Sequence, residues 1–387
     1  THMLQGIGIA SVQQIYKDKE NNMVMVAPLL TGRTLEDILG DRFRTFARNA
    51  TEPEQNLVGG LLFFAKILEP FEAAHGRGIA HADIKPAQIM VTDKDDIWVL
   101  DWGLAHRGRQ AVDIRIVHFP GAPEMILPVI GEQVRGTPVY MSPEHAQGLL
   151  EVTPPSDVYA LSLMLYEFLT GVNPLQYEGG ADVRNIFRLV HNGYTPQHKP
   201  SEHPKRQAVF QIPPELDAIV MKGLALDPEA RYRDAGELLK ALRDVITGRQ
   251  AHQKVSAAVR ALQTKKLPDL AQRTTEAAAA AARFSDLRRS TPARSDSRRL
   301  NPLWEAEREA RATAEERDRC RTEIKHQLIS LLTEAPEHAA ARSMLLDLLG
   351  NHLREAIDAR DTRTIQQLEA EIRQWDIDRT QVEILQD

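Results

Sequence analysis

Two carboxylates and a lysine stand in short loops of this sequence at a spacing that suits phosphoryl transfer. Lys85 lies two residues after Asp83, and Asp101 follows Asp83 by 18 positions. One carboxylate can accept the proton of an attacking hydroxyl group, the other can hold Mg²⁺, and the lysine can neutralise the transferred phosphate. HxD and DxG triplets arise often by chance, so these three residues alone are a weak signal.

Longer motifs surround these residues and occur in a set order. Residues 81–90 (HADIKPAQIM) resemble the protein-kinase catalytic loop HRD-x-K-P-x-x-N, and residues 101–103 (DWG) resemble the metal-binding DFG motif. Three later segments resemble further kinase landmarks: residues 136–144 (GTPVYMSPE), 156–159 (SDVY) and 227–232 (DPEARY). By these five motifs, residues 1–247 are identified as a member of the protein-kinase-like family, and RGTPVYMSPEHAQG and LDWGLA look like the bacterial Ser/Thr type.

The resemblance implies a role for each residue that matches a motif. Asp83 would orient or deprotonate the substrate hydroxyl, Lys85 would contact the γ-phosphate of ATP, and Thr137 would hydrogen-bond near both. Asp101 would ligate Mg²⁺, and Gln88 stands where the family's loop asparagine coordinates the metal. Glutamine keeps the amide oxygen but moves it out by one methylene, so weakened Mg²⁺ binding is expected rather than its loss.

The same resemblance implies which residues surround the adenine ring. With Gly32 aligned to the family's hinge glycine, Ala27 would guard the back pocket. Pro28 would turn its carbonyl toward the adenine amino group, and Leu30 would offer its amide to the ring. Two more side chains would line this pocket, Met90 and Leu100. Simple core packing is the competing interpretation for both of them, and the sequence does not decide between the two.

Several departures from the family pattern bear on activity and regulation. Ala82 replaces the HRD arginine, and residues 102–136 contain no Ser, Thr or Tyr. Many relatives are ordered by a phosphate that pairs with that arginine, so we expect no such switch here. Residues 1–5 resemble the end of the family's αC helix. The chain is therefore expected to lack most of the N-lobe, including the Gly-rich loop and strand lysine, and to be inactive alone.

Two functions of different classes follow from these residues. The first is a Ser/Thr protein kinase that transfers the γ-phosphate of ATP to hydroxyl groups of protein substrates with the help of Mg²⁺. The second is a pseudokinase or scaffold whose kinase-like lobe and helical tail bind protein partners, because Ala82 and Gln88 depart from the catalytic pattern. A Gly-rich strand-turn-strand before Thr1 would favour the enzyme.

Hydrophobic periodicity outlines the elements that hold these loops. Residues 11–16 and 23–30 read as two strands of a hairpin, Leu57 to His75 as a long apolar helix, and short β-type runs alternate with charged loops up to Leu104. Later helices are expected at Ser156–Thr170, Ala181–His191, Pro214–Ala225 and Asp234–Thr247. The expected fold is α+β: a protein-kinase-like fold, with a mainly helical C-lobe and a remnant of the N-lobe sheet, followed by an all-α extension.

The composition shifts after Gly248, where aromatic residues almost vanish and Ala, Arg, Glu and Leu dominate. We predict a kinase domain over residues 1–248, a helical and basic linker over 249–301, and a helical hairpin over 302–387. The hairpin segments, Trp304–Thr333 and Pro336–Trp375, resemble tetratricopeptide-type repeats. Arg308–Arg321 lacks sustained a/d heptads, so a solvated helix face is expected there rather than a coiled coil.

Overall composition excludes several classes of partner. The chain has 48 basic and 54 acidic residues and a net charge of −6, so no global positive field attracts nucleic acid or anionic membranes. The longest apolar stretch, Ala160–Leu169, is far shorter than the ~20 residues of a membrane span. A single cysteine, Cys320, and the absence of an opening signal peptide fit a reducing compartment. We expect a cytoplasmic protein with protein partners, one of them bound through the C-terminal helices.

Overall fold

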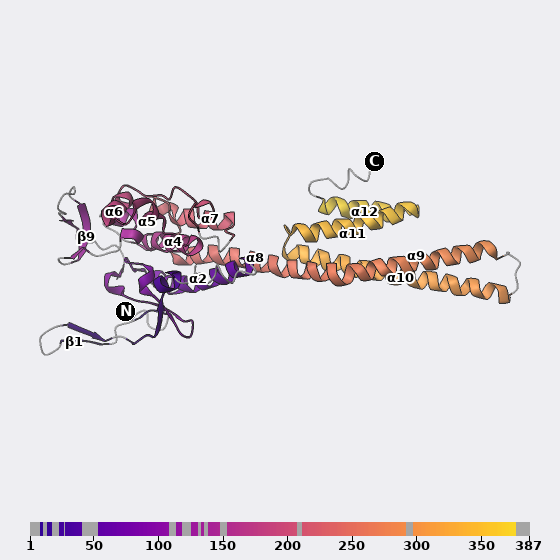
Figure 1. The fold of residues 1–387 in the computed structure, drawn as a ribbon, viewed down its shortest axis with the longest axis horizontal. Coiled ribbons are helices and arrows are strands. Elements are labelled where there is room, and N and C mark those ends of the chain that lie inside the picture. The colour runs from indigo at the N-terminus through magenta and orange to yellow at the C-terminus, as the bar shows by residue number, and fades with distance from the viewer. Residues whose placement is uncertain are drawn as a thin grey trace. The chain divides into compact units, whose positions relative to one another are not determined.

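The chain forms two compact units, residues Thr1–Thr247 and Gly248–Asp387 (Figure 1). The computed structural model describes these residues: 8–10, 14–17, 23–26, 28–40, 53–107, 114–117, 125–130, 133–134, 138–147, 153–206, 211–291 and 297–376. The described part of the first unit is mostly helical with small antiparallel sheets, and the second unit is helical. Of the described helices, none is long and apolar enough to cross a membrane.

Short antiparallel strands frame the loops of the first unit. The predicted hairpin is confirmed, because β1 (Gln14–Lys17) pairs with β2 (Met23–Val26). A second sheet has the order β3-β5-β6, with β3 at Gly32–Thr34, β5 at Ile89–Thr92 and β6 at Ile97–Val99. A third pair joins β4 (Ile79–Ala80) to β7 (His106–Arg107). The catalytic-loop residues 81–88 therefore run from the end of β4 to the start of β5.

Glycine at position 32 allows β3 to approach β5. Gly32 has a φ of +151°, and a Cβ there would lie 2.1 Å from the Val91 carbonyl oxygen. Any other residue would separate the two strands. Thr34 then ends β3 and caps a helix over residues 35–40. Its Oγ1 accepts the Asp37 N–H at 3.2 Å, and its own N–H donates to the Asp37 carboxylate at 3.2 Å, which is the reciprocal pattern of a capping box.

Helix α4 (Pro154–Thr170) is the centre of the first unit. Fourteen of its 17 residues are buried, as expected for a helix that is surrounded by protein on all sides. Its Phe168 ring lies 5.4 Å from the ring of Phe64 in α2 (Pro53–His75). The helix ends at Gly171, which has a φ of +74°, as the sequence predicted. The rigid core helix provides a fixed base for the loops packed on it.

Two short helices, α3 (Pro143–Ala146) and α5 (Pro174–Gly179), were not predicted from the sequence. Three further helices lie close to their predicted positions: α6 (Val183–His191), α7 (Pro214–Gly223) and the first part of α8 (Ala235–Ala261). The prediction that the last of these ends at Thr247 is wrong. Gly248 lies inside α8, because one glycine in a helix costs only about 1 kcal/mol and its neighbours favour helix.

The segment after the DWG motif contains strands that the sequence did not predict. β8 (Ile114–Val117) pairs with β9 (Met125–Ile130), and β9 pairs with β10 (Gln133–Val134). The described parts of this segment form an antiparallel sheet of order β10-β9-β8.

The second unit has its own core of aliphatic side chains, centred on residues such as Ile324, Leu328, Leu345 and Leu349. Its helices are the end of α8, α9 (Leu267–Ser290), α10 (Ser297–Glu334), α11 (Ala339–Asp358) and α12 (Thr362–Trp375). A π-helical turn, η7 (Leu262–Lys266), joins α8 to α9. Pro268 follows this turn and lacks the N–H of a regular helix bond, which accounts for the extra residue in the turn.

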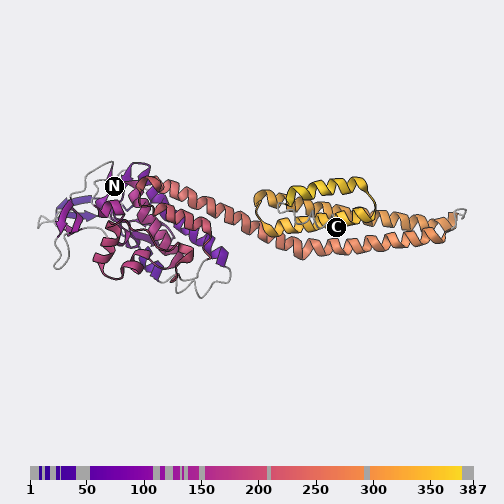
Figure 2. The same ribbon diagram turned by 90° about the horizontal axis from the view of Figure 1, so that it is seen from above.

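Helices α9 and α10 lie side by side in both views (Figures 1 and 2). Small buried residues, Ala277, Ala280 and Ala306, allow their close approach. Most side chains of Arg308–Arg321 are at least partly exposed, which agrees with the solvated face that was expected. The segment 336–375, read as one helix, is two helices, because the chain turns at Arg360 (φ +57°) and Asp361 caps α12. The three-part division of the chain stays a prediction.

Candidate active site

A buried carboxylate on α4 holds the backbone of the loop that carries Asp83. Asp157 accepts the N–H of His81 at 2.6 Å and the N–H of Ala82 at 3.0 Å. Ala82 has a φ of +70°, a left-handed conformation that costs an alanine roughly 1–2 kcal/mol. Hydrogen bonds to a charged acceptor are strong, and these two offset that strain. Helix α4 thereby sets the direction in which the Asp83 side chain leaves the loop.

Histidine 75, at the end of α2, fixes Asp157 from the opposite side. The Ala235 N–H donates to His75 Nδ1 at 3.0 Å, so Nε2 is the protonated nitrogen, and it donates to Asp157 at 2.9 Å. Burial opposes the charge of Asp157, but the hydrogen bonds that it accepts from His75 and from the His81 N–H outweigh burial and lower the pKa of this carboxyl group. His75 of α2 thus connects the Asp157 carboxylate of α4 with the first residue of α8.

The His81 ring connects the catalytic loop to the strand that leads to Asp101. The Asp83 N–H donates to His81 Nδ1 at 3.3 Å, and His81 Nε2 donates to the Leu100 carbonyl oxygen at 3.0 Å. Burial lowers the pKa of His81, so the ring is neutral at pH 7. It also packs against the rings of Trp102 at 4.6 Å and Phe71 at 5.9 Å. Both ring nitrogens are thus hydrogen-bonded, so the His81 ring fixes the position of the loop.

Four side chains that the sequence singled out meet at one point. Lys85 Nζ donates to Asp83 Oδ2 at 3.1 Å. Gln88 Nε2 donates to the same Asp83 oxygen at 3.2 Å and to Asp101 Oδ2 at 3.3 Å. The Asp83 side chain is 11% exposed and that of Lys85 is 27% exposed. One amide group therefore links two carboxylates that are 18 positions apart in the sequence.

Asp101 and Trp102 form the turn that brings the second carboxylate to the site. Asp101 is exposed, has a φ of +53°, and its Oδ1 accepts the Gly103 N–H at 3.4 Å at the start of the 3-10 turn η3 (Trp102–Leu104). Trp102 occupies the place of the family's phenylalanine. Its buried Nε1 donates to the Val99 carbonyl oxygen at 3.0 Å, so the indole N–H is satisfied.

The donor atoms at this point fit a divalent metal ion. Gln88 is buried, and its Oε1 has no hydrogen-bond partner among the described residues. An unsatisfied amide oxygen next to carboxylates is the oxygen-donor set that Mg²⁺ prefers. Within the described segments, no three His, Cys, Asp or Glu side chains gather to bind a metal. That Gln88 and Asp101 would hold Mg²⁺ stays a prediction.

The structure describes only some of the residues that are expected around the adenine ring. Pro28 and Leu30 are partly buried, on either side of Leu29, which is 93% exposed. Met90 is partly buried in β5, opposite Thr34 and Trp98. Leu100 is partly buried, and its carbonyl oxygen holds His81, as described above. Ala27 and Thr137 lie outside the described residues. The adenine contacts of all these residues stay predictions.

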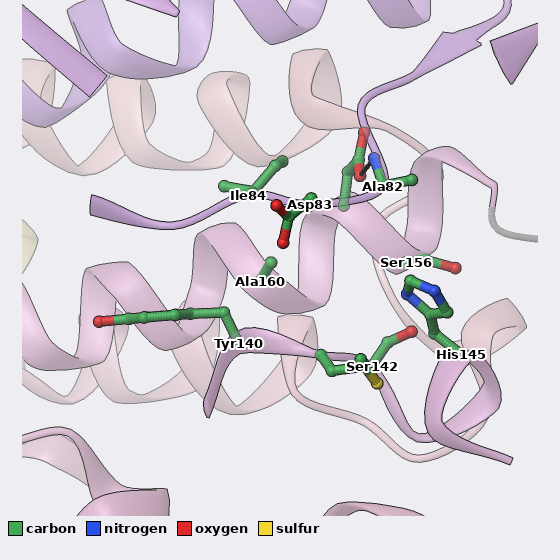
Figure 3. A pocket seen from close by; sticks show the side chains of 10 residues that line it. Ala82, Asp83, Ile84, Tyr140, Ser142, His145, Ser156 and Ala160 are labelled. Atoms are coloured by element: carbon green, nitrogen blue, oxygen red, sulfur yellow. Dashed lines mark hydrogen bonds between the residues drawn. The ribbon is translucent and has the colours of Figure 1, made fainter. Parts of the chain in front are cut away.

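A small cavity lies next to Asp83, between the catalytic loop and the segment that carries Tyr140 and Ser142 (Figure 3). Its volume of about 20 Å³ is enough for a water molecule. Ser142 Oγ, on its wall, is buried and has no partner among the described residues. Tyr140 donates to Glu167 Oε2 at 2.5 Å. The sequence did not predict this tyrosine-glutamate pair, because Glu167 lies outside the motifs, 27 positions after Tyr140.

A model of the protein kinase domain family matches residues 2–241. The chain is 31% identical over 246 residues to Serine/threonine-protein kinase PknD of Chlamydia pneumoniae, across 62% of this chain and 25% of that protein. It is 35% identical over 188 residues to PknD of Mycobacterium tuberculosis (49% and 24%) and 31% identical over 214 residues to PknB of Mycolicibacterium smegmatis (55% and 29%).

The chain spans between 24% and 29% of the length of these relatives. The family model, however, covers more than half of this chain. That match agrees with the sequence motifs and with two features of the site. Asp157 holds the loop that carries Asp83, and Gln88 links Asp83 to Asp101. The chain belongs to the protein kinase family and carries a protein kinase domain homologous to those of Ser/Thr protein kinases.

Proposed function

We propose that the protein is a Ser/Thr protein kinase that transfers the γ-phosphate of ATP to Ser and Thr hydroxyl groups of protein substrates. The contact that carries this proposal is the single amide of Gln88, which connects Asp83 with Asp101 at 3.2 and 3.3 Å. A base and a metal-binding acid so close together suit in-line phosphoryl transfer. The free, buried thiol of Cys320 suits a cytoplasmic protein.

Each of the residues in the site has a separate role in this reaction. Asp83 accepts the proton of the substrate hydroxyl, and Lys85, 3.1 Å from it, neutralises the transferred phosphate. Asp101 and Gln88 hold Mg²⁺, which when bound offsets the negative charge of the phosphate groups. The family resemblance assigns Thr137, which lies outside the described residues, to the same step. Five residues surround the adenine ring in this proposal: Ala27, Pro28, Leu30, Met90 and Leu100.

The test is transfer of labelled phosphate from ATP to a generic protein substrate by the full-length protein. Asp83→Asn is expected to lower the rate at least 100-fold, because it removes the base. Asp93→Asn, an exposed aspartate in the turn after β5, is the matched control and should leave the rate unchanged. An Asp83→Asn protein as active as the control would contradict the proposal.

A groove in the second unit favours a second function, the binding of a protein partner. The groove has a volume of about 700 Å³ and lies between residues of α9 and α11. The residues that line its walls recur at helical spacing. One wall carries Leu267, Leu270 and Thr274. The other wall carries Met344, Leu348, Asn351 and Glu355. Two such stripes form the kind of groove into which an amphipathic helix fits, and this supports a scaffold role for the tetratricopeptide-like helices.

The floor of the groove is held by an ion pair. Arg321 of α10 donates through Nη2 to both carboxylate oxygens of Glu355 at 2.7 Å. This ion pair joins α10 to α11 beside the groove. In the full-length protein, Ser343→Arg would fill the groove from the exposed rim and should abolish binding of a partner, whereas Asp83→Asn should not. Partner binding that survives Ser343→Arg would argue against this second function.

A further inference from the structure

The carboxamide of Gln88 uses both of its N–H donors on anions and leaves its oxygen unused. Nε2 donates to Asp83 Oδ2 at 3.2 Å and to Asp101 Oδ2 at 3.3 Å. Oε1 is buried and unpaired among the residues that the structure describes. A buried carbonyl without a partner is unfavourable, so this arrangement satisfies two carboxylates at the expense of one amide oxygen.

We propose that Gln88 is a positioning residue with two states, and that its amide is a latch between the two acids of the site. This inference rests on the proposed kinase function. Without a divalent cation, the NH₂ group ties Asp83 to Asp101. Before a cation can bind, the amide must turn so that Oε1 faces Asp101. The cation and the amide nitrogen therefore compete for the same carboxylate oxygen.

Like charge explains why the latch is needed. Asp83 and Asp101 bond to the same nitrogen, so their carboxylates are close enough to repel each other. Lys85 compensates Asp83 at 3.1 Å, but no described cation is bonded to Asp101. The amide N–H groups supply partial positive charge between the two acids. Hydrogen bonds to ionised acceptors are stronger than those between neutral groups.

The turned state is favourable only when a cation is present. A half-turn about the last side-chain torsion exchanges the amide oxygen and nitrogen with little movement of the backbone, since this torsion is roughly two-fold. Oε1 would then face two carboxylates and repel them. A divalent cation held by Oε1 and Asp101 would offset this repulsion, because an amide oxygen and a carboxylate are ligands that such a cation prefers. The orientation of the amide and the binding of the cation are thus coupled.

The length of glutamine is part of this device. The family motif has asparagine at this position, whose amide is one methylene closer to the backbone. We expect Gln88→Asn to be too short to reach both carboxylates at once, so that it keeps an amide oxygen for metal but loses the latch. Gln88→Glu removes the donors and adds a third acid. These two variants separate the latch from the ligand.

The first experiment measures thermal unfolding of the full-length protein in a titration with Mg²⁺ alone. Gln88→Glu should unfold at a lower temperature than the wild type without metal, and should bind Mg²⁺ at least 10-fold more tightly. Gln88→Asn should also bind Mg²⁺ more tightly than the wild type. The control is Gln211→Glu, in an exposed loop, which should match the wild type. A Gln88→Glu protein with the wild-type unfolding temperature and Mg²⁺ affinity would overturn the latch.

A second measurement uses the wild-type protein alone, so it does not depend on the folding of any variant. The side-chain ¹⁵NH₂ signals of Gln88 in the wild type should be protected from exchange without metal. They should shift and lose protection as Mg²⁺ is added. Signals that stay unchanged up to saturating Mg²⁺ would overturn the proposal. Neither of these two readouts depends on phosphoryl transfer, so they test the latch alone. The kinase function is tested separately by the Asp83→Asn assay.

Discussion

Glu144 and Arg231, 87 positions apart in the sequence, form two parallel hydrogen bonds of 2.8 Å inside the first unit. Arg231 also donates to the carbonyl oxygens of Pro155, Ala225 and Leu226. Burial opposes the charge of Glu144, but Arg231 outweighs it and lowers the pKa of the carboxyl group. This pair ties the segment that follows Tyr140 to the region before α8.

Removal of one partner of this pair should destabilise the first unit strongly. Arg231→Met leaves the Glu144 carboxylate buried and unpaired, which is expected to cost about 3–5 kcal/mol of unfolding free energy. The exposed Arg233→Met is the matched control, with an expected loss below about 1 kcal/mol. Denaturant unfolding of both variants checks this. A loss for Arg231→Met no larger than that of the control would show that the pair contributes little.

The left-handed backbone at Ala82 predicts an unusual pattern of substitutions. Glycine adopts a φ of +70° without strain, so Ala82→Gly should keep or raise the stability by up to about 1 kcal/mol. A β-branched residue is a clear outlier at positive φ, so Ala82→Val should lose about 2 kcal/mol or more. Denaturant unfolding measures both. A glycine variant less stable than the valine variant would contradict this account of Ala82.

The stability of the second unit should fall in mild acid because of His338. Its Nδ1 accepts the Ala341 N–H at 3.1 Å at the start of α11, and its ring lies 4.5 Å from that of His252. Burial and the neighbouring His252 lower its pKa from 6.5. The unfolded chain therefore takes up the proton first as the pH falls. Neutral His338 contributes fully to the free energy of unfolding above about pH 6.5. As the pH falls below this value the contribution is lost, by up to about 1.4 kcal/mol per pH unit.

Unfolding of the second unit, followed between pH 8 and pH 5, measures this dependence. His338→Asn keeps a side chain that can cap α11 but does not titrate, so its pH profile should be flatter. His326→Asn on α10 is a control that retains His338, and it should keep the wild-type slope. Equal slopes for His338→Asn and the wild type would rule out His338 as the source.

Phosphorylation of the segment between DWG and the SPE motif should not switch this protein on. Residues 102–136 contain no Ser, Thr or Tyr. Beyond them, the Tyr140 hydroxyl is bonded to Glu167, and Ser142 is 2% exposed. Ala82 supplies no cation for a phosphate. Phosphatase treatment of the full-length protein should leave its rate unchanged. A large loss of rate traced by mass spectrometry to phosphate at Thr137 or Ser142 would disprove this.

Local patterns in the sequence were enough for several of the elements and for the protein kinase family. The apolar run before Gly171 predicts a core helix, and α4 has that form because burial on all sides requires apolar residues on all faces. The alternation around the polar turn at residues 17–22 predicts the β1–β2 hairpin. The motifs around Asp83 and Asp101 predict the kinase family, since their residue types and order reflect chemistry that is local to two loops.

Long-range contacts were decided only by the tertiary structure. Nothing in the sequence shows that His75 joins Asp157 to Ala235, or that Gln88 turns its nitrogen, not its oxygen, to both acids. These contacts join residues up to 160 positions apart, and their geometry depends on how α2, α4 and α8 pack together. The sequence determined which polar groups are available, whereas packing determined which of them meet, because a buried polar group takes the partners that the surrounding helices bring within reach.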